Sequence, residues 1–277
     1  MRSLFTYGLD LQRRNLTLPD ILANKAKGIK MTQATAVNGE EAAAVESAGI
    51  DMLGLTSDLV GVARAAAPNI YLIAAIDPEL AIDEDDVVRE AFRSMMAGAD
   101  QIYTIRNLDI VERLAKEGFS VHGHVGLVPR KSIRTGGLRT LGKTADEAVS
   151  ILDDLKRLED AGAVAAEVEC VADEAMAQIS QHTNLITHAI GSGAGADVIF
   201  MFTPDICGEG EKPPRHAKAF VDLKPFHKAV TDERIRGLRA YKDAVANGSF
   251  PNEDVVIHMK DGESHKLAEA LAKRPNV

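Results

Sequence analysis

The sequence predicts a (β/α)8 barrel, and three observations carry this prediction. Eight short stretches, most of them nearly continuous apolar runs, are typical of parallel strands buried on both faces. Amphipathic segments separate most of these stretches. At 48–51, 97–100 and 161–164, an Ala-Gly pair ends a helix-like segment and starts an apolar one, as in short helix-to-strand joints. Eight strands that alternate with helices favour a closed barrel, with a doubly wound open sheet as the alternative.

The elements can be followed along the chain. We expect strands at 29–36, 50–57, 70–77, 101–105, 120–125, 164–169, 185–190 and 198–203. The clearest helix is 144–161, where Thr144 and Glu147 form a possible capping box. The chain from residue 213 onward reads as helical and polar, and no Gly/Ser-rich linker precedes it. We therefore predict one domain, 1–277, in which 213–277 is a C-terminal helical extension.

Composition restricts the class of protein. The chain has 277 residues, of which 45% are hydrophobic and 26% charged, the balance of a globular protein with a large core. A net charge of −9 argues against nucleic-acid binding, which needs a basic face. Two cysteines in no paired pattern indicate neither a disulfide framework nor a zinc cluster. The N-terminus shows no signal peptide or membrane span, so we expect a cytoplasmic protein without membrane contact.

In a barrel, the chemistry lies at the carboxyl ends of the strands. Polar residues at the predicted ends are Ser57, Asp58, Asp77, Arg106, Asn107, His122, His124, Glu167, Glu169 and Asp205, with a glycine-rich run at 191–195. Several have structural readings: Asp58 can cap a helix, Asp77 precedes a proline, and the glycines can form a turn or an anion-binding nest.

Two strands stand out among these candidates. His122 and His124 alternate along a strand, so both imidazoles should point to the same face, as metal ligands, acid–base groups, substrate contacts or structural histidines. Glu167 and Glu169 share one face of a buried strand, where an unpaired carboxylate costs several kcal/mol. This cost favours a functional role for Glu169.

The second half of the chain resembles the ketopantoate hydroxymethyltransferase family. The stretch 121–129, VHGHVGLVP, is similar to the family's GHLGLTP. The stretch 167–171, EVECV, is similar to its LECV, and 190–195, IGSGAG, to its IGIGAG. Further similarities fall at 136–137, 146–148, 214–218 and 247–251. The resemblance places the chain in the phosphoenolpyruvate mutase/isocitrate lyase superfamily of barrels, which agrees with the strand count.

The resemblance implies a chemistry. Family members hold Mg²⁺ on acidic residues, chelate a 2-oxo acid through its carboxylate and keto oxygens, and form an enolate that attacks methylene-tetrahydrofolate. Oxygen ligands suit a hard cation, and the metal stabilises charge on the enolate. By this resemblance Glu169 matches the acid/base glutamate and His124 the substrate-site histidine, whereas His122 has no counterpart.

The first half departs from the family pattern. Ser57-Asp58 inverts the family's Asp-Ser pair, and Ala75 stands where a second metal aspartate is expected, with Asp77 two residues further on. Tyr103 and Ile105 replace a lysine and a glutamate. Losing these contacts should change how substrate or metal is held.

We therefore expect a divergent enzyme that makes or breaks a C–C bond of a 2-oxo acid through a metal-stabilised enolate, with Glu169 and His124 as catalytic residues. Predicted substrate contacts are Ser57, Asp58, His122, Tyr103 and Arg130, and predicted metal ligands are Asp58 and Asp77. The metal is Mg²⁺, with Mn²⁺ or Zn²⁺ as alternatives, and methylene-tetrahydrofolate is a possible co-substrate. The resemblance also implies a homo-oligomer. The alternatives are a superfamily lyase or hydrolase with another carboxylate or carbonyl substrate, and a non-catalytic metabolite-binding homologue.

Overall fold

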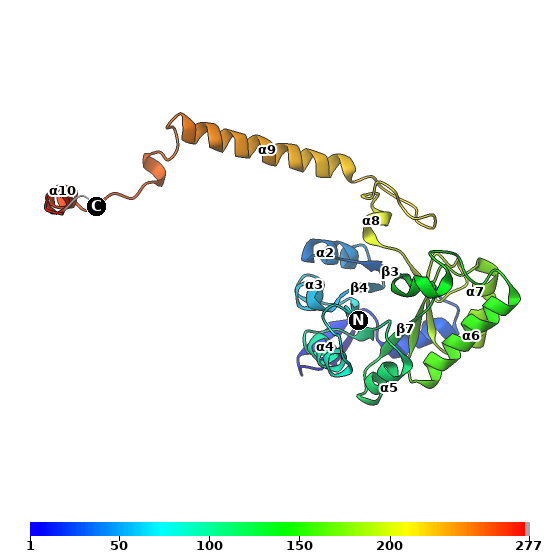
Figure 1. Cartoon of the computed structure of the whole chain (residues 1–277). Coiled ribbons are helices and arrows are strands. Elements are labelled where there is room, and N and C mark those ends of the chain that lie inside the picture. The colour runs from blue at the N-terminus through cyan, green and yellow to red at the C-terminus, as the bar shows by residue number, and fades with distance from the viewer. Residues whose placement is uncertain (275–277) are drawn as a thin grey trace. The chain divides into compact units, whose positions relative to one another are not determined.

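A closed barrel of eight parallel strands forms the centre of the fold, as the sequence predicts (Figure 1). The computed structural model describes residues 1–274. The strands follow one another around the barrel in chain order, and the last, β10, pairs with the first, β3. They are β3 (Met31–Thr35), β4 (Met52–Thr56), β5 (Tyr71–Ala75), β6 (Gln101–Tyr103), β7 (Val121–Gly126), β8 (Ala165–Glu169), β9 (Ile186–Ile190) and β10 (Val198–Phe200). Each predicted stretch overlaps one of them, β7 ends one residue beyond its predicted stretch, and the open-sheet alternative is wrong.

Helices follow most of the strands and surround the barrel (Figure 1). They are α1 (Leu18–Ala26), α2 (Gly39–Ser47), α3 (Val60–Ala66), α4 (Glu84–Met96), α5 (Leu108–Lys116), α6 (Ala145–Asp160), α7 (Asp173–Ile179) and α8 (Thr203–Ile206). Thr144 caps α6 by accepting the N–H of Glu147, while the Glu147 carboxylate accepts the N–H of Lys143, so only half of the predicted capping box forms. Gly49 and Gly98 take φ of +75° and +106° after α2 and α4, as the predicted joints require.

Two apolar cores follow from the alternation of side chains along the strands. Outward-facing residues such as Leu53, Leu72 and Val168 pack against the helices. Inward-facing strand residues form a separate cluster together with Ile21 of α1, and its strand members are Met31, Met52, Tyr71, Ile73, Ala165, Ile186 and Val198. Further along the same strands, the inward positions on β7 and β8 become polar, at His122 and Glu167. Apolar side chains therefore fill the barrel towards the amino ends of the strands, and polar side chains lie towards their carboxyl ends.

An antiparallel hairpin that was not predicted, β1 (Arg2–Phe5) with β2 (Leu11–Arg14), precedes the barrel. Its last residue, Arg14, is 1% exposed and lies 2.7 Å from Oδ1 of Asp100, just before β6. Asp100 also accepts a bond of 2.8 Å from Arg64, which is buried on α3. One carboxylate thus holds two buried guanidinium groups and ties the hairpin to the barrel.

The contacts divide the chain after Asp222, and the second unit starts at Leu223. It contains the exposed helix α9 (Lys224–Ala246) and the shorter helix α10 (Glu263–Ala272). The prediction of one domain with an extension from residue 213 stays a prediction. Within residues 1–274, no helix has both the length and the apolar character needed to cross a membrane.

Candidate active site

The ends of β7 and β8 bring one imidazole and two carboxylates together. In the parallel register His124 is opposite Glu167, and Gly126 is opposite Glu169. Ligand atoms of His124, Glu167 and Glu169 all lie within 4.8 Å of one another. Their side chains are only 2%, 11% and 14% exposed. We call these three residues the mouth cluster, and it contains both predicted catalytic residues.

Tyr103, from the neighbouring strand β6, fixes the orientation of His124. Its Oη lies 2.6 Å from Nδ1 of the imidazole. Burial raises the pKa of Tyr103 well above its usual value, and the charges of Glu167 and Glu169 raise it further, so the phenol keeps its proton and donates it to Nδ1. Nε2 then carries the ring hydrogen, and it lies 3.1 Å from the carbonyl of Leu127 and 3.3 Å from Oε2 of Glu169.

Glu167 is the deepest acid of the mouth cluster. Burial raises its pKa from 4.5 to about 7, against the opposing effect of His124 and with a further increase from Glu169. Nε2 of His124 lies 3.9 Å from Oε1 of Glu167. A carboxyl that titrates near neutral pH can both give and accept a proton, which is the property of an acid–base group.

A second pair of histidines lies in the barrel interior. His122 and His188 are buried, with ring centroids 4.3 Å apart. Nδ1 of His188 is 2.6 Å from Oε1 of Gln33, whereas both ring nitrogens of His122 lack a hydrogen-bond partner among the described residues. Burial lowers the pKa of His188 to about 3 and that of His122 well below its usual value, so both rings are neutral.

The backbone at the mouth cluster is tightly packed. Gly126 has φ of +81°, and a Cβ at that position would lie 2.4 Å from the carbonyl oxygen of Glu169. Only glycine allows β7 and β8 to approach this closely. Directly after Glu169, Cys170 takes the left-handed φ of +51°, which turns the chain out of the strand. Non-glycine residues in this conformation concentrate at functional sites.

The mouth cluster borders a cavity with two lobes. The polar lobe, of about 290 Å³, is lined by Thr56, Ala75, Ile76, Asp77, Pro78, Tyr103, Ile105, His124, Val128, Pro129, Arg130, Glu167, Glu169 and Phe202. The apolar lobe, of about 300 Å³, is lined by Gln33, Thr35, Ala36, Val37, Gly54, Leu55, Thr56, Leu59, Ile73, Ala75, Tyr103, His122, Glu167, Phe200, Phe202 and Pro204. Thr56, Ala75, Tyr103, Glu167 and Phe202 line both. Adjoining lobes of this size suit one small molecule.

Arg130 and Asp77 meet at the rim of the polar lobe. The Arg130 guanidinium lies 3.5 Å from Oδ1 of Asp77 and 3.4 Å from Oε1 of Glu79. Arg130 is 54% exposed and can turn towards a substrate carboxylate. Asp77 lines the lobe, but it is not part of the mouth cluster.

Ser57 and Asp58 form the start of a 3-10 turn after β4, and neither is among the residues that line the two lobes. Ser57 is buried and its Oγ has no partner among the described residues, whereas Asp58 is exposed. The predicted substrate and metal roles of these two residues stay predictions. Within residues 1–274, the group whose ligand atoms converge closely enough for one ion is the mouth cluster.

Sequence reasoning placed neither Gln33 nor His188 in the interior, and it singled out Glu167 without assigning it a role. His188 did carry a signal, because it interrupts the buried stretch Ile-Thr-His-Ala-Ile of β9. The glycine-rich run after β9 is not an open nest, since the Asp173 carboxylate accepts the N–H of Ala194 there.

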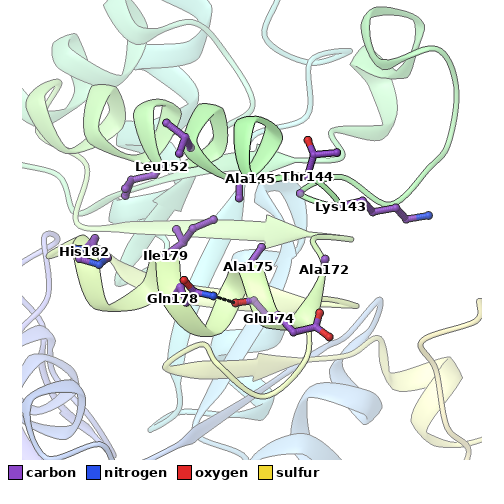
Figure 2. Close-up of a pocket in the computed structure, with 13 residues that line it drawn as sticks. Lys143, Thr144, Ala145, Leu152, Ala172, Glu174, Ala175, Gln178, Ile179 and His182 are labelled. Carbon is purple, nitrogen blue, oxygen red and sulfur yellow. Dashed lines mark hydrogen bonds between the residues drawn. The ribbon is translucent and has the colours of Figure 1, made fainter.

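A further cleft of about 460 Å³ lies between α6 and α7, outside the barrel (Figure 2). Its walls are the apolar faces of the two helices, where Ala145 and Leu152 of α6 oppose Ala175 and Ile179 of α7. Lys143, Glu174 and His182 also line it, and none of the predicted site residues does. The chemistry is therefore assigned to the two-lobed cavity.

The comparisons with known proteins agree with the geometry. A family model described as ketopantoate hydroxymethyltransferase matches residues 60–253. The 3-methyl-2-oxobutanoate hydroxymethyltransferase of Hyperthermus butylicus is 31% identical, over 94% of this chain and 96% of its own. Among solved structures, phosphoenolpyruvate phosphomutase from Streptomyces platensis has a TM-score of 0.51 at 12% identity, over 93% of this chain and 97% of its own. A phosphonopyruvate hydrolase in complex with oxalate and Mg²⁺ has a TM-score of 0.51 at 14% identity, over 92% and 99%. These structures show the same barrel fold.

Proposed function

Because the chain belongs to the ketopantoate hydroxymethyltransferase family, we propose that it makes or breaks a C–C bond of a 2-oxo acid through a metal-stabilised enolate. Its relatives make it an enzyme of transferase or lyase type. The observation that carries the finer proposal is the mouth cluster, in which a carboxylate, an oriented imidazole and a second carboxyl face one lobe.

Glu169 is proposed to move the proton at the carbon next to the keto group. Its side chain lines the polar lobe and is 14% exposed, so a bound substrate can reach it. His124 lines the same lobe and presents Nε2–H, a donor suited to an oxygen on which negative charge develops. The bond from Tyr103 keeps that hydrogen on Nε2 before the substrate arrives.

The remaining predicted contacts have distinct proposed tasks. Arg130 at the rim would receive the substrate carboxylate, and Tyr103 would form the wall between the lobes. His122 would contact the substrate from the apolar lobe. Ser57 and Asp58 stay predicted contacts from the turn after β4, a position outside the lining of both lobes.

The donor set fits a divalent cation. The mouth cluster offers two carboxylates, which suit Mg²⁺ or Mn²⁺ and can also bind Zn²⁺. The His124 imidazole is not counted as a ligand, because Nδ1 accepts the hydrogen bond from Tyr103 and Nε2 carries the ring hydrogen. Glu167 would hold the cation, since it is the carboxyl not assigned to the proton, and Asp77 of the same lobe remains a proposed ligand, as does Asp58. When bound, the cation supplies stabilisation of the enolate's negative charge.

Two apolar residues in the polar lobe favour retaining the alternative of a lyase or hydrolase. Ala75 and Ile105 line the polar lobe where the family resemblance leads us to expect an aspartate and a glutamate. With fewer polar side chains, the lobe offers fewer contacts for a co-substrate. The use of methylene-tetrahydrofolate is therefore a proposal only. A homo-oligomer in the cytoplasm likewise remains our expectation.

Two measurements test the proposal. Proton–deuterium exchange at C3 of a panel of 2-oxo acids, followed by NMR, reports enolisation directly. Calorimetric titration of the chelator-treated protein with Mg²⁺, Mn²⁺ and Zn²⁺ reports the cation, with Glu117→Gln, an exposed site on α5's C-terminal side, as the control for Glu167→Gln. Exchange in no member of the panel would contradict the enolate, and no heat with any of the three ions would contradict the metal.

A further inference from the structure

The apolar lobe has no task in the proton chemistry. Its walls include Leu55, Ile73, Phe200 and Phe202, and it adjoins the mouth cluster, because Glu167 lines both lobes. At about 300 Å³ it has room for on the order of ten groups of water size, at ~30 Å³ each. A carboxylate and a keto group placed in the polar lobe would therefore leave this volume for the rest of the substrate.

His122 gives the apolar lobe one polar feature. Its ring is 0% exposed and lines the lobe, and both nitrogens lack a partner among the described residues. A neutral imidazole carries one donor and one acceptor, and leaving such groups unpaired in an apolar interior is costly. Tyr103 and His188 only pack against the ring, with centroids at 5.4 and 4.3 Å. A ligand atom is the partner that this histidine lacks.

We propose that the apolar lobe binds the substituent of the 2-oxo acid, and that this substituent is a bulky hydrocarbon group with one uncharged polar atom that pairs with His122. This inference rests on the proposed function, because it takes the 2-oxo acid end of the substrate to lie at the mouth cluster. The substituent carries no negative charge because the residues that line the lobe include no lysine or arginine, and it is mainly hydrocarbon because most of these residues are apolar.

The volume of the apolar lobe is too large for a small substituent to fill. A single methyl group would leave most of the lobe without contacts, whereas a branched or aromatic group would replace water against Ile73 and the two phenylalanines. In a hydrophobic pocket, each well-placed methylene changes affinity by about 10-fold or more. Substituent size should therefore dominate affinity, and the polar atom should refine it.

The test measures dissociation constants of four 2-oxo acids for the full-length protein: pyruvate, 4-methyl-2-oxopentanoate, phenylpyruvate and 4-hydroxyphenylpyruvate. We expect phenylpyruvate to bind about 10-fold or more tightly than pyruvate. The added hydroxyl of 4-hydroxyphenylpyruvate should gain a further factor of about 3 to 10 from one hydrogen bond. Equal affinities for all four acids would overturn the inference while leaving the proposed function intact. Binding of none would contradict the proposed function itself.

Variants separate the two parts of the inference. His122→Phe keeps an aromatic ring and removes the nitrogens, so it should erase the difference between the two aromatic acids. His182→Phe, at an exposed histidine outside both lobes, is the matched control and should keep that difference. Phe200→Leu should reduce the affinity ratio of phenylpyruvate to pyruvate, and it serves if His122→Phe does not fold. A hydroxyl effect that persists in His122→Phe would overturn the role of His122.

Discussion

Glu167→Gln should change how the stability of the protein depends on pH. Glu167 is 8% exposed in the barrel interior, and burial raises its pKa from 4.5 to about 7. Glutamine keeps the shape of the side chain and cannot ionise. The variant therefore isolates the cost of placing a negative charge at this depth, provided that a chelator removes divalent cations from both proteins.

The sign and size follow from linkage. The pKa is higher in the folded protein, so the folded state holds the proton more tightly, and this stabilisation is complete below pH 4.5. It is lost as the pH rises through about 7. Since each pH unit across this window is worth about 1.4 kcal/mol, the wild type should lose about 3 kcal/mol from ionisation of Glu167 alone.

Urea unfolding provides the assay, and circular dichroism is the probe because the chain has no tryptophan. The free energies of unfolding of wild type and Glu167→Gln are compared at pH 4.5 and pH 8. The difference between the two proteins should move by about 3 kcal/mol in favour of the variant at high pH. The exposed control Glu117→Gln should follow the wild type. Parallel profiles for wild type and Glu167→Gln would refute the assignment of a buried, proton-holding carboxyl.

Two further predictions concern buried polar contacts, and urea unfolding measures both. Tyr103→Phe should cost about 1–2 kcal/mol because His124 loses its donor at 2.6 Å, whereas Tyr71→Phe, which removes a buried hydroxyl without a partner, should cost nothing or stabilise. Equal losses would argue against the Tyr103–His124 bond. Asp100→Asn should cost about 3 kcal/mol or more because Arg14 and Arg64 lose their buried counter-charge, whereas Asp86→Asn, at a pair with the exposed Arg89, should have a much smaller effect. A small loss in Asp100→Asn would show that water or other acceptors replace the carboxylate.

The barrel was predictable because its signals are local. Buried parallel strands need apolar residues on both faces, and each joint such as Ala48-Gly49 needs a left-handed glycine, so strand number and order can be read along the chain. The N-terminal hairpin was not predictable in this way. Its strands are short and largely exposed. It is held by the ion pair of Arg14 with Asp100, two residues far apart in the sequence, so no local sequence pattern predicts it.

The site was predictable strand by strand but not across strands. Alternation along β7 and β8 places His124 and Glu169 on the inner face, and the family resemblance singles them out. The pairing of Tyr103 with His124 depends on the register between β6 and β7, and the meeting of His122 with His188 depends on the barrel's diameter. Such distances are fixed only when the sheet closes into a barrel. The raised pKa of Glu167 and the apolar lobe could therefore be recognised only from the structure.

The central claim is that the mouth cluster removes a proton next to the keto group of a 2-oxo acid, with Glu169 as the group that takes it. Proton–deuterium exchange at C3, measured by NMR for the wild type, Glu169→Gln and Asp205→Asn, tests this most directly. Asp205 lies on α8, outside the lining of both lobes. Exchange that is lost in Glu169→Gln and kept in Asp205→Asn is the predicted result, and exchange at the wild-type rate in Glu169→Gln would contradict it.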